Sequence, residues 1–448
     1  MNHPLGNLSR RELLVRGAFG TAGLMLGGQS LFGKSTPPPV VTAASRAPAK
    51  SVIQIWMWGG PSHLDSFDPK PDAGRDYCGP YQSPIETSAG GVRICEKLPL
   101  LAEQARHFSL VRSMTHGINA HETASYAVQT GHAPGRLLWP SLGALVSLFK
   151  GYDHGYKDLI PPYVVLTSAQ GRFSECGFLG PAHKPFATGG DPNRERFEVD
   201  GIVSSRITDE RQKSRRELLE ELDTFGRALP DDPALRRMEE SEKKAYELIL
   251  GEARELFDLS TESEGVRDSY GRSTFGQSCL MARRLVERGV PYVTINYKGW
   301  DTHKQHFQTM DRNLPEMDAG LATLIADLES RGLLDQTIVW WGGEFGRTPK
   351  VQWEPPWNGG RGHYGACFSA LLAGGGFRGG QVVGASDATG SEVAERPVYP
   401  NEFLGSILER MGIDPEGPLP NPLGEDLKVM PALVDGFPQG DGRLAEIM

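Results

Sequence analysis

The amino-acid sequence predicts an α/β protein with a mostly parallel β-sheet. The first observation is a series of short, continuous apolar segments, which are typical of strands buried on both faces. The second is an amphipathic helix that lies between two of these segments. The third is the abundance of turn-forming residues, because 55 glycines and 33 prolines among 448 residues indicate long connecting loops rather than a helical bundle.

Five segments are predicted to be buried strands. They are 52–58 (VIQIWMW), 162–168 (PYVVLTS), 291–297 (PYVTINY), 337–341 (TIVWW) and 367–376 (CFSALLAGGG). Between the third and the fourth, apolar residues recur every three or four positions over 314–331, which predicts a helix that stops at Gly332. This βαβ pattern, repeated along a chain, gives a mostly parallel sheet.

The first 50 residues resemble a twin-arginine export signal followed by a linker. Arg10 and Arg11 precede a glycine-rich apolar stretch, and a Pro/Ala/Ser-rich segment with small residues near Ala47 follows. We therefore expect the chain to be exported through the twin-arginine pathway to the periplasm or beyond, with the apolar stretch either cleaved or kept as an anchor. No other apolar run has the length of a membrane span. The folded domain is expected over 51–436, with a C-terminal tail at 437–448.

Composition excludes some classes of function. A net charge of -9 argues against a nucleic-acid partner, because phosphate backbones are bound by clustered Lys and Arg. None of the five cysteines lies in a C-x-x-C motif, which argues against a cysteine zinc site. Residues 191–268 are charged and helix-rich, and we expect a helical insertion that either covers one face of the sheet or forms a lid.

The segments that follow the predicted strands carry the candidate site residues. Ligands bind beyond the carboxyl ends of strands in open α/β sheets. Asp301 and His303 follow the third strand and, two positions apart, point the same way in an extended segment. They either chelate a divalent metal such as zinc or manganese or form a hydrogen-bonded pair that shapes the loop. Glu344 and His363, on two neighbouring loops, are further candidate ligands.

Three other features near strand ends have two interpretations. Arg347 either clamps an anionic substrate in bidentate fashion or pairs with Glu344 or Asp301. His63 and Asp65 follow the first strand and are further candidates for the site, whereas Asp65, like Asp68, could instead form the turn before Pro69. The segment 374–379 (GGGFRG) has the glycine spacing of a dinucleotide-binding loop, but no helix is predicted after it, so we expect a glycine turn.

Six motifs together resemble one protein family. In chain order they are WGGPSHLDSFDPKP, LVRSMTH, GWDTH, EFGRTP, GRGHY and GGQVVGASD. They resemble the domain-of-unknown-function 1501 family of exported bacterial proteins, over about residues 51–436. That family is grouped with the alkaline phosphatase and sulfatase superfamily. The resemblance implies a three-layer α/β/α sandwich, alkaline phosphatase-like, and metal-assisted hydrolysis of phosphate or sulfate esters.

The resemblance also implies an altered active site. Sulfatases carry their nucleophile nine residues before a Thr-Gly pair, and counting back from Thr130 reaches His121. A formylglycine is therefore impossible there, and Thr123 is an alternative nucleophile outside the matching place. Asp301, His303 and His363 resemble the Asp, His and His of one phosphatase zinc site.

The other half of the usual two-metal centre departs from the superfamily pattern. Gly59 and Gly60 stand where metal-binding aspartates usually end the first strand, so these ligands are missing or replaced by His63 or Asp65. Glu344 keeps a carboxylate without the usual second ligand beside it.

Two functions follow from these observations. The first is a hydrolase in which Asp301, His303 and His363 hold a divalent metal, zinc being expected and manganese or calcium being alternatives. Glu344 and His121 then hold a second metal or position water, His121 acts as acid or nucleophile, and Arg347 clamps a small or polysaccharide ester. The second is a non-catalytic relative that binds sulfated or phosphorylated polymers. The sequence does not indicate an oligomeric state.

Overall fold

The computed structural model describes residues 49–168, 175–195, 197–199 and 252–448, together with a few residues between 208 and 218. The predicted export signal and linker over 1–50 lie almost entirely outside the described residues. Much of the predicted insertion over 191–268 does so too, and its role as cover or lid stays a prediction. No described helix has the length and hydropathy that a membrane span requires.

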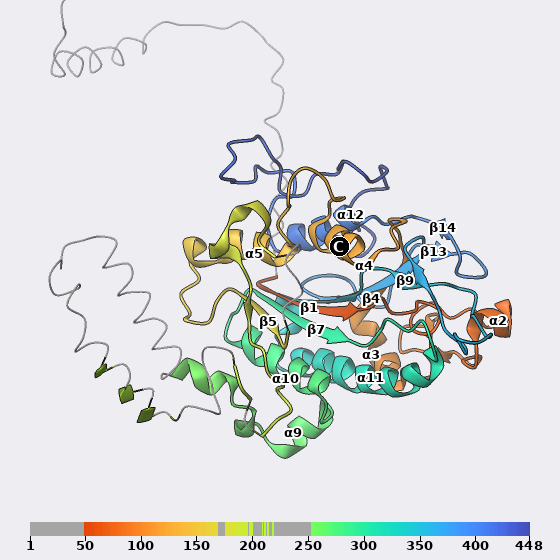
Figure 1. The fold of residues 1–448 in the computed structure, drawn as a ribbon, viewed down its shortest axis with the longest axis horizontal. Coiled ribbons are helices and arrows are strands. Elements are labelled where there is room, and N and C mark those ends of the chain that lie inside the picture. The colour runs from red at the N-terminus through yellow and green to blue at the C-terminus, as the bar shows by residue number, and fades with distance from the viewer. Residues whose placement is uncertain are drawn as a thin grey trace, which may run out of the picture. The chain divides into compact units, whose positions relative to one another are not determined.

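The centre of the fold is an eight-stranded sheet in the order β12-β4-β11-β8-β1-β7-β5-β6 (Figure 1). Five pairings are parallel, and the two pairings made by β11 are antiparallel. This confirms the predicted mostly parallel sheet. In the order of the sheet, the strands are Val382–Val383, Phe108–Met114, Phe368–Gly374, Thr337–Gly342, Ser51–Trp58, Tyr292–Lys298, Tyr163–Leu166 and Phe186–Ala187.

The reversed direction of β11 decides which loops meet at the site. In a parallel sheet the residues after each strand gather at one edge. Because β11 runs the other way, the residues that precede it reach this same edge. His363 precedes β11 and therefore joins residues that follow β1, β7 and β8.

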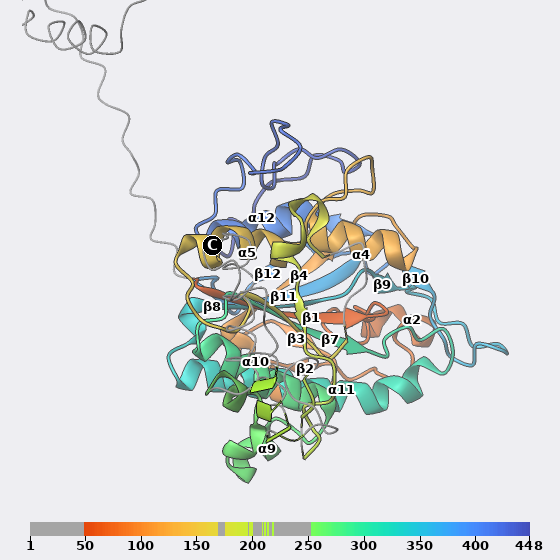
Figure 2. The same cartoon turned by 60° about the vertical axis from the view of Figure 1, so that its left-hand side comes forward.

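Helices cover both faces of the sheet, which gives the three predicted layers. One face carries α3 (Pro99–Gln104), α10 (Thr274–Glu287) and α11 (His306–Ser330), and the other carries α4 (His121–Thr130), α5 (Leu142–Lys150) and α12 (Pro400–Arg410) (Figures 1 and 2). Each layer of helices packs on its own hydrophobic core. The two cores account for the near-continuous apolar character of the central strands.

Strand β1 shows how one segment serves both cores. Ile53 and Ile55 belong to the core under α10 and α11, whereas Val52 and Trp56 belong to the core under α5 and α12. Alternate side chains of a strand point to opposite faces, so a strand between two cores is mostly apolar. The buried polar side chain of Gln54 is satisfied by hydrogen bonds from Tyr292 and Thr294. All of β1 except Trp58 is buried.

Two elements differ from the sequence prediction. The helix expected over 314–331 begins earlier, at His306, and includes Pro315. Its first turns carry polar residues and so lack the apolar stripe. Strand β4 was not predicted because Ser109, Arg112 and Ser113 interrupt its apolar run. By contrast, Gly374, Gly375 and Gly376 all have positive φ in a turn, as expected for the GGGFRG segment.

The remaining regular elements are short. Three two-stranded sheets are formed by β2 (Ile85–Glu86) with β3 (Arg93–Ile94), β9 (Gly346–Arg347) with β10 (His363–Tyr364), and β13 (Ala385–Ser386) with β14 (Val393–Glu395). Helices α2 (Arg75–Cys78) and α9 (Glu264–Ser269) complete the α-helices described here. The β9–β10 pair joins Arg347 to His363, which fixes two predicted site residues relative to each other.

Candidate metal centre

Three imidazole rings surround the carboxylate of Asp301, at the edge of the sheet where the parallel strands end. Oδ1 of Asp301 lies 3.1 Å from Nε2 of His303 and 3.2 Å from Nε2 of His363. Its Oδ2 lies 3.3 Å from Nε2 of His121. The structure thus brings together four residues that the sequence predicted for the site, from the loop after β7, from β10 and from the start of α4.

Two of the rings make a hydrogen bond through Nδ1, on the side away from Asp301. These bonds determine the tautomer, and so whether the Nε2 atom that faces Asp301 carries a proton or a lone pair. Nδ1 of His363 lies 2.8 Å from the backbone oxygen of Asn119, and a carbonyl oxygen can only accept, so Nδ1 carries the proton. Nδ1 of His121 lies 2.6 Å from Oε1 of Glu344 and donates to that carboxylate in the same way. In the neutral rings both Nε2 atoms are therefore free to accept.

These free lone pairs suit a divalent cation. Nε2 of His303 and Nε2 of His363 are 2.8 Å apart, and both face the same carboxylate oxygen. Ligand atoms bound about 2.0–2.2 Å from one zinc ion lie about 3 Å from each other. His121, Asp301 and His363 also each offer a ligand atom, all within 4.8 Å of one another. The donor set of imidazole nitrogens and a carboxylate therefore fits zinc or a similar ion.

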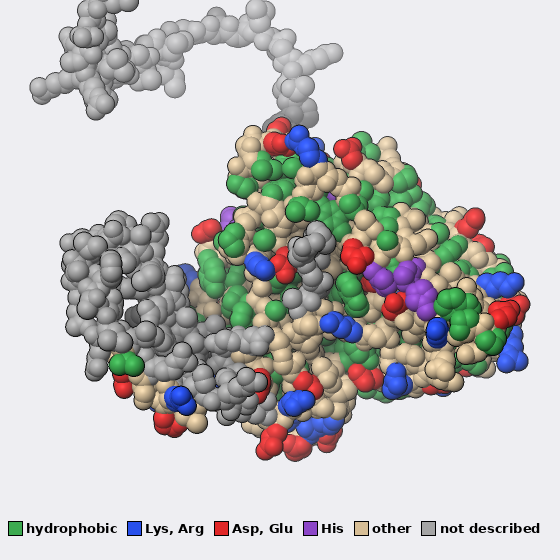
Figure 3. All heavy atoms as spheres, in the orientation of Figure 1, with side chains coloured by type: hydrophobic (Ala, Val, Ile, Leu, Met, Phe, Trp, Pro, Cys, Tyr) green, Lys and Arg blue, Asp and Glu red, His purple; other side chains and the backbone are tan. Residues whose placement is uncertain are grey.

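The cluster is open to solvent on one side. The side chain of Asp301 is 45% exposed and that of His303 is 39% exposed, whereas His121 and His363 are each 21% exposed. Histidine side chains gather in one place on this face of the molecule, beside acidic groups (Figure 3). A metal held here has protein ligands on one side and room for water or substrate on the other, as catalytic sites require.

Aromatic rings hold the two less exposed imidazoles in place. Trp58 at the end of β1 stacks on His121 with ring centroids 6.1 Å apart, and Phe345 stacks on His363 with centroids 4.6 Å apart. Trp58 follows the last buried residue of a strand, and Phe345 is itself fully buried. The rings thus tie the site to the rigid sheet rather than to mobile loops.

Glu344 lies behind His121 instead of among the residues around Asp301. Its side chain is fully buried, and Oε1 accepts hydrogen bonds from His121 and, at 2.9 Å, from the backbone nitrogen of Gly59. The hydrogen bond to Glu344 raises the pKa of His121 above its ordinary value, against the effect of burial. Glu344 was predicted as a metal ligand, but the structure places it as a carboxylate that orients the His121 ring.

Arg347 is buried and faces Asp301. Its guanidinium donates to Oδ1 of Asp301 at 2.6 Å and to the backbone oxygens of Gly59, Gly60 and Arg361. Burial would raise the pKa of Asp301, but the hydrogen bond and charge of Arg347 outweigh it and lower the pKa to about 2. Of the two predicted roles, the structure has the pairing with Asp301, and the side chain has no exposed surface with which to clamp an anion.

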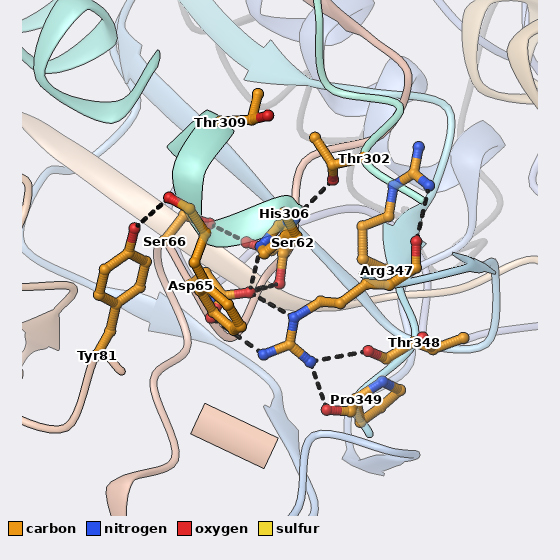
Figure 4. A network of polar contacts seen from close by, with 12 residues as sticks. Ser62, Asp65, Ser66, Tyr81, Thr302, His306, Thr309, Arg347, Thr348 and Pro349 are labelled. Carbon is orange, nitrogen blue, oxygen red and sulfur yellow. Dashed lines mark hydrogen bonds and ion pairs between the residues drawn. The ribbon is translucent and has the colours of Figure 1, made fainter. Parts of the chain in front are cut away.

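His63 and Asp65 do not join the cluster around Asp301. Asp65 is buried and pairs with Arg361 and His306, while its Oδ2 also accepts from Ser62 at 2.5 Å (Figure 4). Nε2 of His63 lies 2.8 Å from the oxygen of Gly390, and the ring is buried. The structure therefore does not bring these two residues to Asp301, and hydrogen bonds and an arginine partner already satisfy the carboxylate of Asp65.

Thr123 also lies apart from the cluster. Its hydroxyl donates to the backbone oxygen of Ala120 at 3.3 Å, in the first turn of α4. A hydroxyl used in this way supports the start of a helix rather than a nucleophilic role. The Thr-Gly pair at the other end of α4 is a helix stop, since Gly131 has a φ of 71° and its nitrogen bonds back to Ala127.

Several residues that shape the site were not predicted. Asn119 orients His363, and His116 donates from Nε2 to the backbone oxygen of Glu344 at 2.7 Å. Burial lowers the pKa of His116 to about 4, so this ring is neutral. The motif LVRSMTH ends at His116, and Asn119 follows three positions later, but the roles of both residues depend on where the chain leaves β4, and β4 was not predicted.

The two glycines after β1 have a packing role that the sequence could have indicated. Gly59 has a φ of 114°, and a Cβ atom there would lie 2.2 Å from the backbone nitrogen of Asp301. Gly60 has a φ of 79°, and a Cβ atom there would clash with Phe345 in the same way. A glycine pair after a strand can mark a close approach of two chains. Here it replaces the expected metal ligands because any side chain would push Asp301 away.

Comparisons with known proteins give a family and distant structural relatives. The family described as "Protein of unknown function (DUF1501)" matches residues 49–435. No curated protein matches the chain. Among solved structures, the chain is similar to the PsFucS1 sulfatase from Pseudoalteromonas sp., with 16% identity, 82% of this chain and 68% of that chain covered, and a TM-score of 0.35.

Two further solved structures have similar scores. A protein in the alkaline phosphatase superfamily from Vibrio parahaemolyticus is 10% identical, with 82% of this chain and 68% of that chain covered and a TM-score of 0.36. The alkaline phosphatase from the Antarctic bacterium TAB5 is 10% identical, with 81% and 98% covered and a TM-score of 0.34.

Proposed function

The chain belongs to the DUF1501 family, and on that premise we propose that it is a metal-dependent hydrolase of phosphate or sulfate esters. The observation that carries the proposal is the convergence of three imidazole rings on the carboxylate of Asp301, with the far nitrogens of His121 and His363 bonded to other groups. Imidazole nitrogens and a carboxylate at this spacing form a donor set that suits a divalent cation.

Asp301, His303 and His363 are the residues that would hold the metal. A divalent ion there supplies a water of lowered pKa and offsets negative charge on the phosphate or sulfate group. The structure supports this division of roles because His303 and His363 face Oδ1 of Asp301, whereas His121 faces Oδ2. Arg347 uses one lone pair of Oδ1 and keeps the carboxylate ionised.

His121 is the residue that would move the proton. Glu344 accepts a hydrogen bond from Nδ1–H, which keeps that proton on the ring, so Nε2 is the atom that takes a proton from the attacking water. The water oxygen forms the new bond to phosphorus or sulfur, the ester bond breaks, and His121 returns the proton to the departing alcohol oxygen. Glu344 holds the ring in the tautomer that this exchange needs.

A second candidate, a binding protein without catalysis, is favoured by one observation. The place of the superfamily nucleophile is held by His121, and Arg347 is too buried to contact a substrate anion. A metal at Asp301 would then bind sulfated or phosphorylated polymers without cleaving them. We further propose export through the twin-arginine signal in residues 1–50, which would place either activity outside the cytoplasm.

Metal analysis combined with an ester panel tests the proposal. The protein is purified after expression with added zinc or manganese, its metal content is measured by elemental analysis, and it is assayed with p-nitrophenyl phosphate, bis-p-nitrophenyl phosphate and p-nitrophenyl sulfate. We expect about one ion per chain, turnover of at least one ester, and loss of turnover in His303→Ala and His121→Ala.

The outcomes separate the two candidates. His121→Ala should retain metal while losing activity, and His303→Ala should lose both. The exposed His154→Ala variant, in the 3-10 turn 152–154, serves as the matched control and should behave as the wild type. Bound metal with no turnover of any ester contradicts the hydrolase, and a chain without stoichiometric metal contradicts both candidates.

A further inference from the structure

A polar pocket lies beside the Asp301 site, at the carboxyl ends of β5 and β7. Its volume is about 540 Å³, within the ~300–1,000 Å³ typical of small-molecule sites. Lys298, the last residue of β7, lines the pocket, and Asp301 follows it by three residues. Three residues span at most ~11 Å even when extended, so the pocket and the Asp301 site are neighbours on one edge of the sheet.

Most residues that line the pocket have polar side chains, and neither charge is in excess. One cation and one carboxylate reach it, from Lys298 and Glu316. The other polar groups are hydroxyls and amides, contributed among others by Ser168, Asn193 and Thr274. Such a lining suits an uncharged ligand with many hydrogen-bonding groups better than it suits a second phosphate or sulfate.

Asn296 provides the sharpest evidence about the ligand. Its side chain lines the pocket and is only 6% exposed. Nδ2 donates to the backbone oxygen of Ser168 at 3.0 Å, but Oδ1 has no hydrogen-bond partner in the part of the chain that the structure describes. A buried acceptor without a partner is costly, so the group that satisfies it must bring a hydrogen. A hydroxyl group does so, whereas a phosphate or sulfate dianion does not.

An aromatic pair supplies an apolar wall in the same pocket. Phe275 and Tyr297 both line it, and their rings are stacked with centroids 4.2 Å apart and an interplanar angle of 16°. The Tyr297 hydroxyl donates to Oε1 of Glu316 at 3.0 Å, which fixes the ring. Aromatic walls next to hydroxyl and amide groups match a sugar ring, which has C–H faces and hydroxyl edges.

We propose that this pocket binds the alcohol part of the substrate, and that this part is a sugar unit. The inference rests on the proposed ester hydrolysis, in which the phosphate or sulfate group lies at Asp301 and the remainder of the ester must lie beside it. The substrate class is then a phosphorylated or sulfated saccharide, with Asn296 as a residue that determines specificity.

Direct binding of unesterified sugars tests the pocket without catalysis. Methyl β-D-galactoside and lactose are titrated into the full chain, and binding is followed by saturation-transfer NMR. We expect binding to the wild type and about five- to tenfold weaker binding to Asn296→Ala, from the loss of a hydrogen bond and its buried partner. Thr274→Ala, at an exposed position in the lining, should weaken binding without any risk to the core.

Controls separate this inference from the proposed function. Lys304→Ala, exposed beside His303, should leave sugar binding unchanged. His363→Ala should lose ester hydrolysis and keep sugar binding. A wild type that binds neither sugar, or pocket variants that bind as well as the wild type, would overturn the inference even if aryl esters are cleaved. A wild type that binds sugar but cleaves no ester contradicts only the proposed hydrolysis.

Discussion

Two clusters of the same residue types lie near the same edge of the sheet, yet their surroundings differ. Around Asp301 are Arg347 and three histidines, and the carboxylate is 45% exposed. Around Asp65 are Arg361 and His306, and the carboxylate is 1% exposed. The first cluster presents imidazole acceptors to solvent, whereas in the second, hydrogen bonds from several sides saturate the carboxylate (Figure 4).

The difference shows that residue type alone does not identify a site. A buried carboxylate with an arginine and an imidazole is complete, because its charge is balanced and its lone pairs are used. The carboxylate of Asp301 also has an arginine partner, but it is half exposed and faces imidazole nitrogens whose lone pairs suit a further cation. Hydrogen-bond donors and acceptors, together with exposure, therefore favour a structural role for Asp65 and support the proposed metal site at Asp301.

Removing the two carboxylate charges should have very different effects on stability. Asp65→Asn leaves the guanidinium of Arg361 buried without a counter-charge, and we expect it to cost about 3–5 kcal/mol of unfolding free energy. Asp301→Asn should cost at least ~2 kcal/mol less, because the site is partly solvated and the carboxylate of Glu344 still offsets the charge of Arg347. Urea unfolding of the metal-free proteins measures both. Equal losses would mean that the two clusters are both structural.

Metal binding should separate the histidines of the two clusters. His363→Ala is expected to reduce bound zinc from about one ion per chain to a small fraction, and to abolish the rise in Tm on zinc addition, which for a free ion at a hundred times Kd corresponds to about 2.7 kcal/mol. His306→Ala, in the buried cluster, should lower Tm but keep the response to zinc. Elemental analysis and thermal unfolding with and without zinc decide this. A zinc response that is lost in His306→Ala and kept in His363→Ala would place the metal at the Asp65 cluster and contradict the proposed site at Asp301.

The same comparison explains what the sequence could predict. All five apolar segments are strands of the sheet, because a strand buried on both faces has a composition that polar loops do not share. Asp301, His303 and His363 were found because they follow or precede these strands. His63 and Asp65 were included for the same reason, since they too follow a buried strand, and the structure places them outside the Asp301 cluster.

What the sequence could not predict depends on contacts between distant segments. The partner of Asp65 is Arg361, almost three hundred positions later, and nothing in a local pattern announces it. Glu344 was placed correctly at a strand end, but its burial behind His121 depends on how α4 begins. The reversed direction of β11, which brings His363 to the site, follows from the sheet order and not from the composition of the strand.

Glu344 is a buried carboxylate that contacts the solvent-exposed Asp301 cluster through His121. Changing it therefore tests how a buried group affects that cluster. Its hydrogen bond raises the pKa of His121, and in Glu344→Gln we expect that pKa to fall. A raised histidine pKa stabilises the fold at low pH, and this contribution is lost as pH rises through the folded-state value. As pH rises through that range, the Glu344→Gln variant should therefore lose less unfolding free energy than the wild type. Histidine NMR titration of the metal-free protein measures the pKa, and an unchanged value would contradict the role given to Glu344.

Asp318 offers the smallest and most specific test, because it is buried like Asp65 but has no arginine partner among the described residues. It is 2% exposed, and its carboxylate accepts hydrogen bonds from the backbone nitrogens of Leu100 and Leu101 at 2.9 and 2.7 Å. Burial outweighs these bonds and raises its pKa to about 6. The pKa of Asp65, by contrast, is held below its usual range by Arg361 and His306 despite burial.

The sign of the pH effect follows from the raised value. The folded protein holds a proton on Asp318 at a pH where the unfolded chain has released it, so stability falls as pH rises from about 4 to about 6. We expect Asp318 to contribute about 1–3 kcal/mol to that fall. Asp318→Asn cannot titrate and should lack this part of the fall, which urea unfolding at pH 4.5 and pH 7 would measure as a difference between variant and wild type. If both proteins lose the same free energy over this range, then burial without a cation does not govern Asp318, and the contrast between the Asp301 and Asp65 clusters would need a cause other than exposure and charge balance.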